Sequence, residues 1–68
     1  MVFAIDKATV SINKVGVEYI VTLEANKVAI EVIGESIGGI DRELMAIGYG
    51  DNVRDKIVKA IEYFRGRE

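Results

Sequence analysis

The chain has no cysteine and no histidine among its 68 residues. Without cysteine no disulfide can stabilise the fold, and without either residue type the commonest zinc ligands are missing. A domain of this length buries only about 60% of the surface that its unfolded chain exposes, and such a core rarely supplies more than roughly 3–5 kcal/mol. We therefore expect no metal and no other cofactor, and we expect oligomerisation to add stability.

Long apolar runs and an excess of positive charge are also lacking. No hydrophobic stretch approaches membrane-spanning length, and no basic region precedes an apolar core at the start of the chain. The net charge is −2, so no overall positive field attracts nucleic acid or a membrane surface. Because half of the residues are apolar, disorder is excluded. We expect one small domain over residues 1–68, located in the cytoplasm. The absence of cysteine and glutamine, beside many Ile, Val, Glu and Lys residues, is typical of a thermophile.

Three stretches alternate between apolar and polar side chains, as β-strands with one buried face do. They cover residues 8–13, 17–25 and 27–33. The expected inward side chains are even-numbered in the first and third stretches and odd-numbered in the second, and many are β-branched. The sequence therefore predicts three half-buried strands.

The parity of these residue numbers restricts how the strands pair. Inward partners in the second and third strands must have numbers that add to an odd value, which a two-residue turn satisfies. Ala25 and Asn26 fit that turn and place Glu24 opposite Lys27 as a cross-strand ion pair. Residues 13–16 form the turn-like connection between the first two strands.

The first residues break this parity. Phe3 and Ile5 are odd-numbered, whereas the inward residues of the strand that follows are even-numbered. The change at Asp6 and Lys7 predicts a bulge or a bend, with residues 2–5 as a short extension of that strand.

The second half of the chain contains one clear helix. Residues 34–41 contain three glycines and predict a loop, and residues 42–48 have the length and content of another strand. Asp51 is a natural N-cap for a helix over residues 51–65, and Gly66 is a natural stop. The inner face of that helix is formed by Val53, Ile57, Ala60, Ile61 and Phe64, with Val58 at its margin.

These elements predict an α+β fold. It consists of a small antiparallel β-sheet of three to four strands with one C-terminal α-helix packed on one face. The opposite face stays uncovered and carries Ile20, Ala29 and Ile33 among polar residues. We expect these three residues to form a protein interface, most simply in a homodimer whose sheets pack face to face or whose edges join.

The stretch Gly48-Tyr49-Gly50 between the last strand and the helix resembles part of a phosphate-binding loop. The dinucleotide fingerprint requires a third glycine where this chain has Val53, and the P-loop lysine is missing. Asp51 also places a carboxylate where a phosphate would lie. We interpret the stretch as a turn with a capping aspartate, with an anion site as the alternative.

Four carboxylates surround the glycine-rich loop: Glu31, Glu35, Asp41 and Glu43. They could meet as a catalytic pair or hold a hard cation through oxygen, but their spacing matches no ion-binding loop. A solvated acidic rim is the simpler interpretation. We expect no catalytic residues, no metal site and no enzymatic activity.

The end of the chain is its most basic part. Its cations are Arg54, Lys56, Lys59, Arg65 and Arg67. Acidic residues are interleaved with them, which is typical of a solvated helix face with i, i+4 pairs. Nucleic-acid binding through these five residues is the alternative hypothesis.

Two segments, residues 19–32 and 46–64, together resemble small HicB-type antitoxins. The matching positions are the Gly50-Asp51 turn and the helix ending with Ala60, Ile61 and Phe64. The acidic pair that usually follows the turn is only partly matched by Arg54-Asp55, and "ESIGGID" replaces a Pro-Gly-Cys-like segment. The resemblance implies a βββα homodimer that masks a small RNA-cleaving toxin. Residues 44–65 also resemble, more faintly, the strand-Gly-helix part of Alba-type chromatin proteins, which implies DNA or RNA binding.

The residues and the resemblance together predict a non-enzymatic protein-interaction module. We expect it to be dimeric, with antitoxin-like masking of a partner protein as its most specific form. A small nucleic-acid-binding protein is the alternative.

Overall fold

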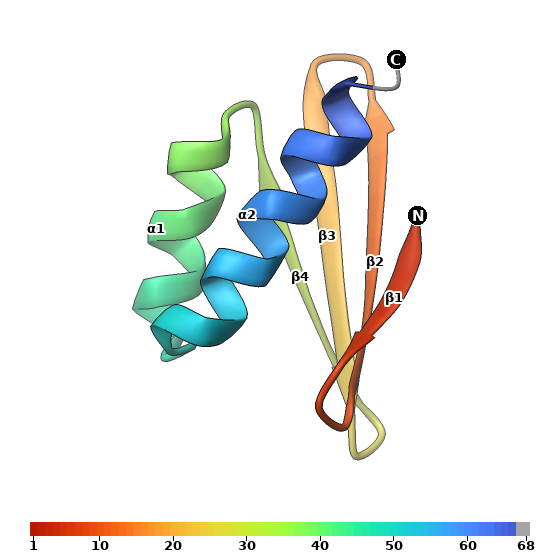
Figure 1. The fold of residues 1–68 in the computed structure, drawn as a ribbon, viewed down its shortest axis with the longest axis vertical. Helices are drawn as coiled ribbons and strands as arrows, with labels where there is room; N and C mark the ends of the chain where they lie inside the picture. Colours follow the sequence, from red (N-terminus) through yellow and green to blue (C-terminus); the bar gives the residue numbers. More distant parts are fainter. Residues whose placement is uncertain (67–68) are drawn as a thin grey trace.

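The computed structural model describes residues 1–66 as a four-stranded sheet followed by two helices (Figure 1). The strands are β1 (Val2–Ile5), β2 (Ala8–Val15), β3 (Glu18–Ala25) and β4 (Val28–Gly34). The helices are α1 (Ile37–Ile47) and α2 (Asp51–Gly66). Each strand pairs antiparallel with its neighbour in the order β1-β2-β3-β4, so the α+β class with an antiparallel sheet is confirmed.

Three two-residue turns connect the strands, at Asp6-Lys7, Gly16-Val17 and Asn26-Lys27. The predicted bulge or bend at Asp6-Lys7 is a two-residue turn, and β1 is a strand in its own right rather than an extension of β2. The parity changes there because the turn pairs Ile5 with Ala8, and directly paired residues face the same side. Val17, expected to point inward, lies in a turn and is 67% exposed.

The β3–β4 turn lies one residue further along the chain than predicted. Asn26 and Lys27 have φ angles of 51° and 65°, the positive values that a type I′ turn requires at both central positions. Asparagine tolerates this left-handed conformation better than alanine, which explains why Ala25 stays in the strand. Glu24 consequently faces Ala29 rather than Lys27, and Ile20 lies directly opposite Ile33 rather than diagonal to it.

Helix α1 replaces the predicted loop and strand over residues 34–48, so the prediction of a single helix is wrong. Ile37, Ile40 and Leu44 recur at helical spacing and face the core. The Ser36 hydroxyl accepts a hydrogen bond of 3.1 Å from the Gly39 N–H and caps the N-terminus. Gly48, with φ of 117°, ends the helix, and its N–H donates to the carbonyls of the last turn.

Helix α2 confirms the predicted inner face. Ile57 and Ile61 are fully buried, and Val53, Ala60 and Phe64 pack against the core. The Phe64 ring meets Tyr19 of β3 edge to face, with ring centroids 6.3 Å apart. Asp51 is already the first residue of the helix rather than its N-cap, and the helix runs through Gly66.

The core lies between one face of the sheet and both helices, because residues from all four strands and both helices share one buried cluster. Every buried residue in the described range is apolar. The chain passes closely from β4 to α1, since a Cβ added at Gly34 would lie 3.0 Å from Ile40 Cγ1. The two helices therefore cover one face and leave the other without a helix. Neither helix within residues 1–66 combines the length and apolarity needed to cross a membrane.

Candidate functional site

The uncovered side of the sheet, which we call the open face, is formed by the residues that alternate with the buried ones. Val10 and Ile12 of β2, Tyr19 of β3 and Val32 of β4 are buried under the helices, so their neighbours along each strand point the other way. The open face consists of Val2, Ala4, Thr9, Ser11, Asn13, Val15, Glu18, Ile20, Thr22, Glu24, Ala29, Glu31 and Ile33.

The register orders this face into rows across the strands. One row places Asn13, Ile20 and Ile33 side by side, with Ile33 48% exposed and Ile20 half-buried. The next row on β3 and β4 pairs Thr22 with Glu31, and the row after that pairs Glu24 with Ala29. Of the three predicted interface residues, Ile20 and Ile33 therefore pair directly across β3 and β4, while Ala29 lies two rows away on the same face.

The charge on the open face has one sign. Its charged residues are Glu18, Glu24 and Glu31, and no lysine or arginine occupies an open-face position in the described strands. Lys14 alternates to the helix side, where its Nζ lies 5.4 Å from the centroid of the Tyr19 ring. The predicted turn placed Lys27 opposite Glu24, whereas Lys27 lies in the observed turn and Glu24 pairs with Ala29.

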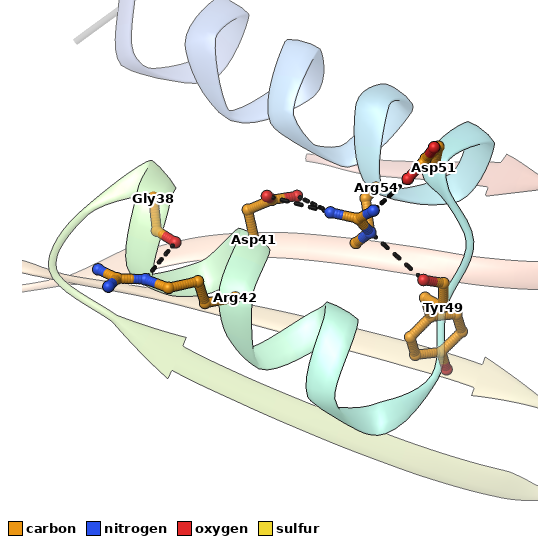
Figure 2. Close-up of polar contacts among 6 residues, drawn as sticks. All are labelled: Gly38, Asp41, Arg42, Tyr49, Asp51 and Arg54. Atoms are coloured by element: carbon orange, nitrogen blue, oxygen red, sulfur yellow. Dashed lines mark hydrogen bonds and ion pairs between the residues drawn. The ribbon is translucent and has the colours of Figure 1, made fainter.

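A second polar cluster joins the two helices around Arg54 (Figure 2). The Arg54 guanidinium donates to both carboxylate oxygens of Asp41 at 3.2 Å, to the Tyr49 carbonyl at 3.3 Å, and to the carboxylate of Asp51. Its side chain is only 15% exposed. Arg54 therefore holds α1, α2 and the segment between them together, and its donors are already engaged.

The other predicted nucleic-acid contacts are dispersed. Lys59 pairs with Asp55 at 3.1 Å, and Lys56 and Arg65 are exposed on α2. Lys56 and Arg65 are separated by two and a half helical turns and so lie on opposite sides of the helix axis. Arg67 lies outside the described residues. The cations of α2 therefore do not form one basic stripe within residues 51–66.

The stretch Gly48-Tyr49-Gly50 joins two helices, and its first two backbone N–H groups form the hydrogen bonds that end α1. The N–H groups of Gly48 and Tyr49 both donate to the Leu44 carbonyl. Asp51 follows at the first position of α2, where its carboxylate contacts Arg54 and suits the positive end of the helix dipole. This geometry supports the interpretation as a turn rather than as a phosphate cradle.

The four carboxylates expected near the glycine-rich loop are not brought together. Glu31 lies on the open face, Glu35 precedes α1, Asp41 binds Arg54, and Glu43 is exposed on α1. Among residues 1–66 no cluster of three or more acidic side chains is arranged to hold a metal ion.

Two of the hollows on the helix side of the molecule involve residues discussed above. One of about 220 Å³ is mostly apolar and is lined by Ile5, Val10, Leu23, Tyr49 and Val53 among others. The other, of about 310 Å³, is lined by Asp41, Asp51, Arg54, Asp55 and Val58. Ligand pockets usually have volumes of about 300–1,000 Å³ and are largely enclosed. The apolar hollow is smaller than this range, and the polar hollow surrounds Arg54, whose side chain is already paired.

No family model, curated protein or solved structure matches this chain. The resemblances to HicB-type and Alba-type proteins therefore stay predictions. The segment before Gly50, which the HicB-type resemblance expects to be a strand, is helix α1.

Proposed function

We propose that this protein is a non-enzymatic interaction module that binds another protein through the open face, centred on Ile20 and Ile33. The observation that carries the proposal is the one-sided cover of the sheet, which leaves this cross-strand isoleucine pair in contact with solvent. Branched apolar side chains in a row across two strands form an exposed apolar surface against which a partner can pack. Val15, 63% exposed on the same face, extends that surface toward the β2–β3 turn.

Antitoxin-like masking is the most specific form of this proposal, and it rests on the resemblance in sequence alone. A homodimer also stays a proposal. Joining the free edges of two sheets suits it better than face-to-face packing, because the open face carries three carboxylates and no cation in the described strands.

Nucleic-acid binding through α2 is the weaker candidate. Arg54 is engaged by two aspartates and a carbonyl, and Lys59 is paired with Asp55. A phosphate-binding surface needs cations that are unpaired and close together.

The proposal is tested with the double substitution Ile20→Thr and Ile33→Thr, which keeps β-branched side chains but removes apolar surface. Met45→Gln on α1 is the matched control, because Met45 is 52% exposed on the covered side of the molecule. Affinity purification from the source cells followed by mass spectrometry should recover the same partner with the wild type and the control. Recovery should fall to background with the double variant.

A partner that binds the double variant as well as it binds the wild type would show that the open face is not the binding surface. Tight binding of DNA or RNA in a gel-shift assay, weakening steeply as salt rises, would favour the nucleic-acid alternative.

A further inference from the structure

The charges of this protein are segregated between its two sides. The open face carries Glu18, Glu24 and Glu31 and no cation in the described strands, a formal charge of −3. The whole chain carries only −2, so its other parts together are slightly positive. The net acidity of the molecule is therefore the acidity of one face.

Two of these glutamates are close neighbours of each other, and one of them, Glu31, adjoins the isoleucine pair. Glu31 lies opposite Thr22, and Glu24 lies two residues along β3 from Thr22, so the glutamates are diagonal neighbours on adjacent strands. Diagonal side chains are about 7–8 Å apart at the backbone and are within reach of each other. Glu31 is also two residues from Ile33 on the same strand, which places a carboxylate next to the apolar contact.

This arrangement decides between the candidate occupants. A second copy packed face to face would bring the glutamates of both copies into one interface with no cation to neutralise them, and like charges across an interface oppose binding. A surface that presents lysine or arginine beside an apolar side chain would satisfy Glu24 and Glu31 and cover Ile20 and Ile33 together. Complementary charge is also what selects and orients a partner during encounter.

We infer that the open face binds a basic protein segment, with lysine or arginine side chains at Glu24 and Glu31 and an apolar side chain over Ile20 and Ile33. This inference rests on the proposed function, because it names the partner chemistry of the same face. Glu31 lies one row from the apolar pair and Glu24 lies in the row beyond. The contacts between these carboxylates and the cations therefore flank the apolar contact, and they set specificity and salt dependence.

The test uses a soluble synthetic peptide in which lysines alternate with leucines, and a counterpart with glutamates in place of the lysines. Binding is followed by amide chemical shifts of the isotopically labelled full chain. The lysine peptide should shift the amides of the open-face residues of β3 and β4, and the glutamate peptide should not. Added salt should lower the affinity for the lysine peptide.

The decisive variant is Glu24→Gln with Glu31→Gln, which keeps side-chain size and removes two charges. It should lower the affinity for the lysine peptide by roughly tenfold, since two charge-assisted contacts are lost. Asp55→Asn with Glu62→Gln is the matched control, because it removes two charges from exposed positions of α2. That control should leave the affinity within about twofold of the wild type.

Three results would overturn the inference: equal binding of both peptides, shifts confined to the helices, or an unchanged affinity in the Glu24→Gln, Glu31→Gln variant. A wild-type dimer with its open face protected from hydrogen exchange would show that a second copy is the occupant. If the isoleucine double variant loses its natural partner while the glutamine double variant keeps it, the proposed function stands and the basic partner is excluded. If both variants keep that partner, the proposed function fails as well.

Discussion

At the scale of single residues, Arg54 has the most consequential environment outside the core. It is the partly buried cation that bridges Asp41 of α1 and the Tyr49 carbonyl to α2 (Figure 2). From the sequence, Arg54 is expected among the solvent-exposed helix cations, because its main partner lies 13 residues away on a segment predicted to be a loop. No local spacing indicates a pair of this kind, whereas the Lys59–Asp55 pair follows directly from i, i+4 spacing.

Replacing Arg54 with lysine should lower the free energy of unfolding by about 1–2 kcal/mol. Lysine keeps the charge but cannot reach two carboxylate oxygens and a carbonyl with a planar fork of donors. Urea denaturation followed by circular dichroism would measure the change. The control is Lys59→Ala, which removes an exposed pair and should cost no more than about 0.5 kcal/mol. Equal effects of both substitutions would contradict a bridging role for Arg54.

At the scale of elements, the strands and the last helix were predictable because their apolar residues follow a regular period. The inward residues of β2, β3 and β4 and the buried stripe of α2 are those that the alternation and the helical spacing indicated. Helix α1 was missed because Gly38 and Gly39 occupy its first turn, where glycine usually indicates a loop. The period of Ile37, Ile40 and Leu44, with Ser36 before it, is the signal that could have identified it.

The β3–β4 turn provides a test at this scale. Lys27 has a φ of 65°, a conformation that glycine adopts without steric cost and lysine does not. Lys27→Gly creates the Asn-Gly pair preferred in type I′ turns and should raise the free energy of unfolding by about 0.5–1 kcal/mol. Thermal unfolding monitored by circular dichroism would detect the gain.

The same substitution at Lys7 is the control, because Lys7 occupies the second position of the β1–β2 turn without a positive φ. Lys7→Gly should therefore lower stability by about 0.5–1 kcal/mol through the added flexibility of the unfolded chain. Stabilisation by both substitutions would show that turn conformation is not the cause.

At the scale of the whole molecule, composition and pattern correctly indicated a small α+β domain with one face of its antiparallel sheet covered. The number of helices and the exact pairing of β3 with β4 could not be read from periodicity. Both depend on a few backbone positions, namely a turn that starts at Asn26 and a helix that starts after Ser36. A shift of the turn by one residue changes every cross-strand pair, which is why the direct pairing of Ile20 with Ile33 could not be predicted from the sequence.

The topology makes a prediction about folding. Each strand pairs with the next one along the chain, α1 contacts β4, and α2 contacts α1, so the main contacts link consecutive elements. Chains with such local contacts fold quickly, and this chain has no proline whose isomerisation could delay a fraction of the molecules. Stopped-flow refolding followed by tyrosine fluorescence should show no phase in the range of about 10–100 s at 25 °C.

A double-jump experiment would check this result, because proline-limited phases grow with the time spent unfolded. A slow phase of constant amplitude would instead indicate association or a trapped intermediate, and it would contradict refolding limited only by local contacts.

The absence of lysine from the open-face positions of the described strands has a practical consequence for chemistry on this protein. Amine-reactive dyes, biotin esters and coupling to an activated sensor chip can attach at the strand turns, where Lys7 and Lys27 lie, at Lys14 on the helix side of β2, or on α2 at Lys56 and Lys59. The strands that carry Ile20 and Ile33 contain no lysine themselves and would remain unmodified by these reagents.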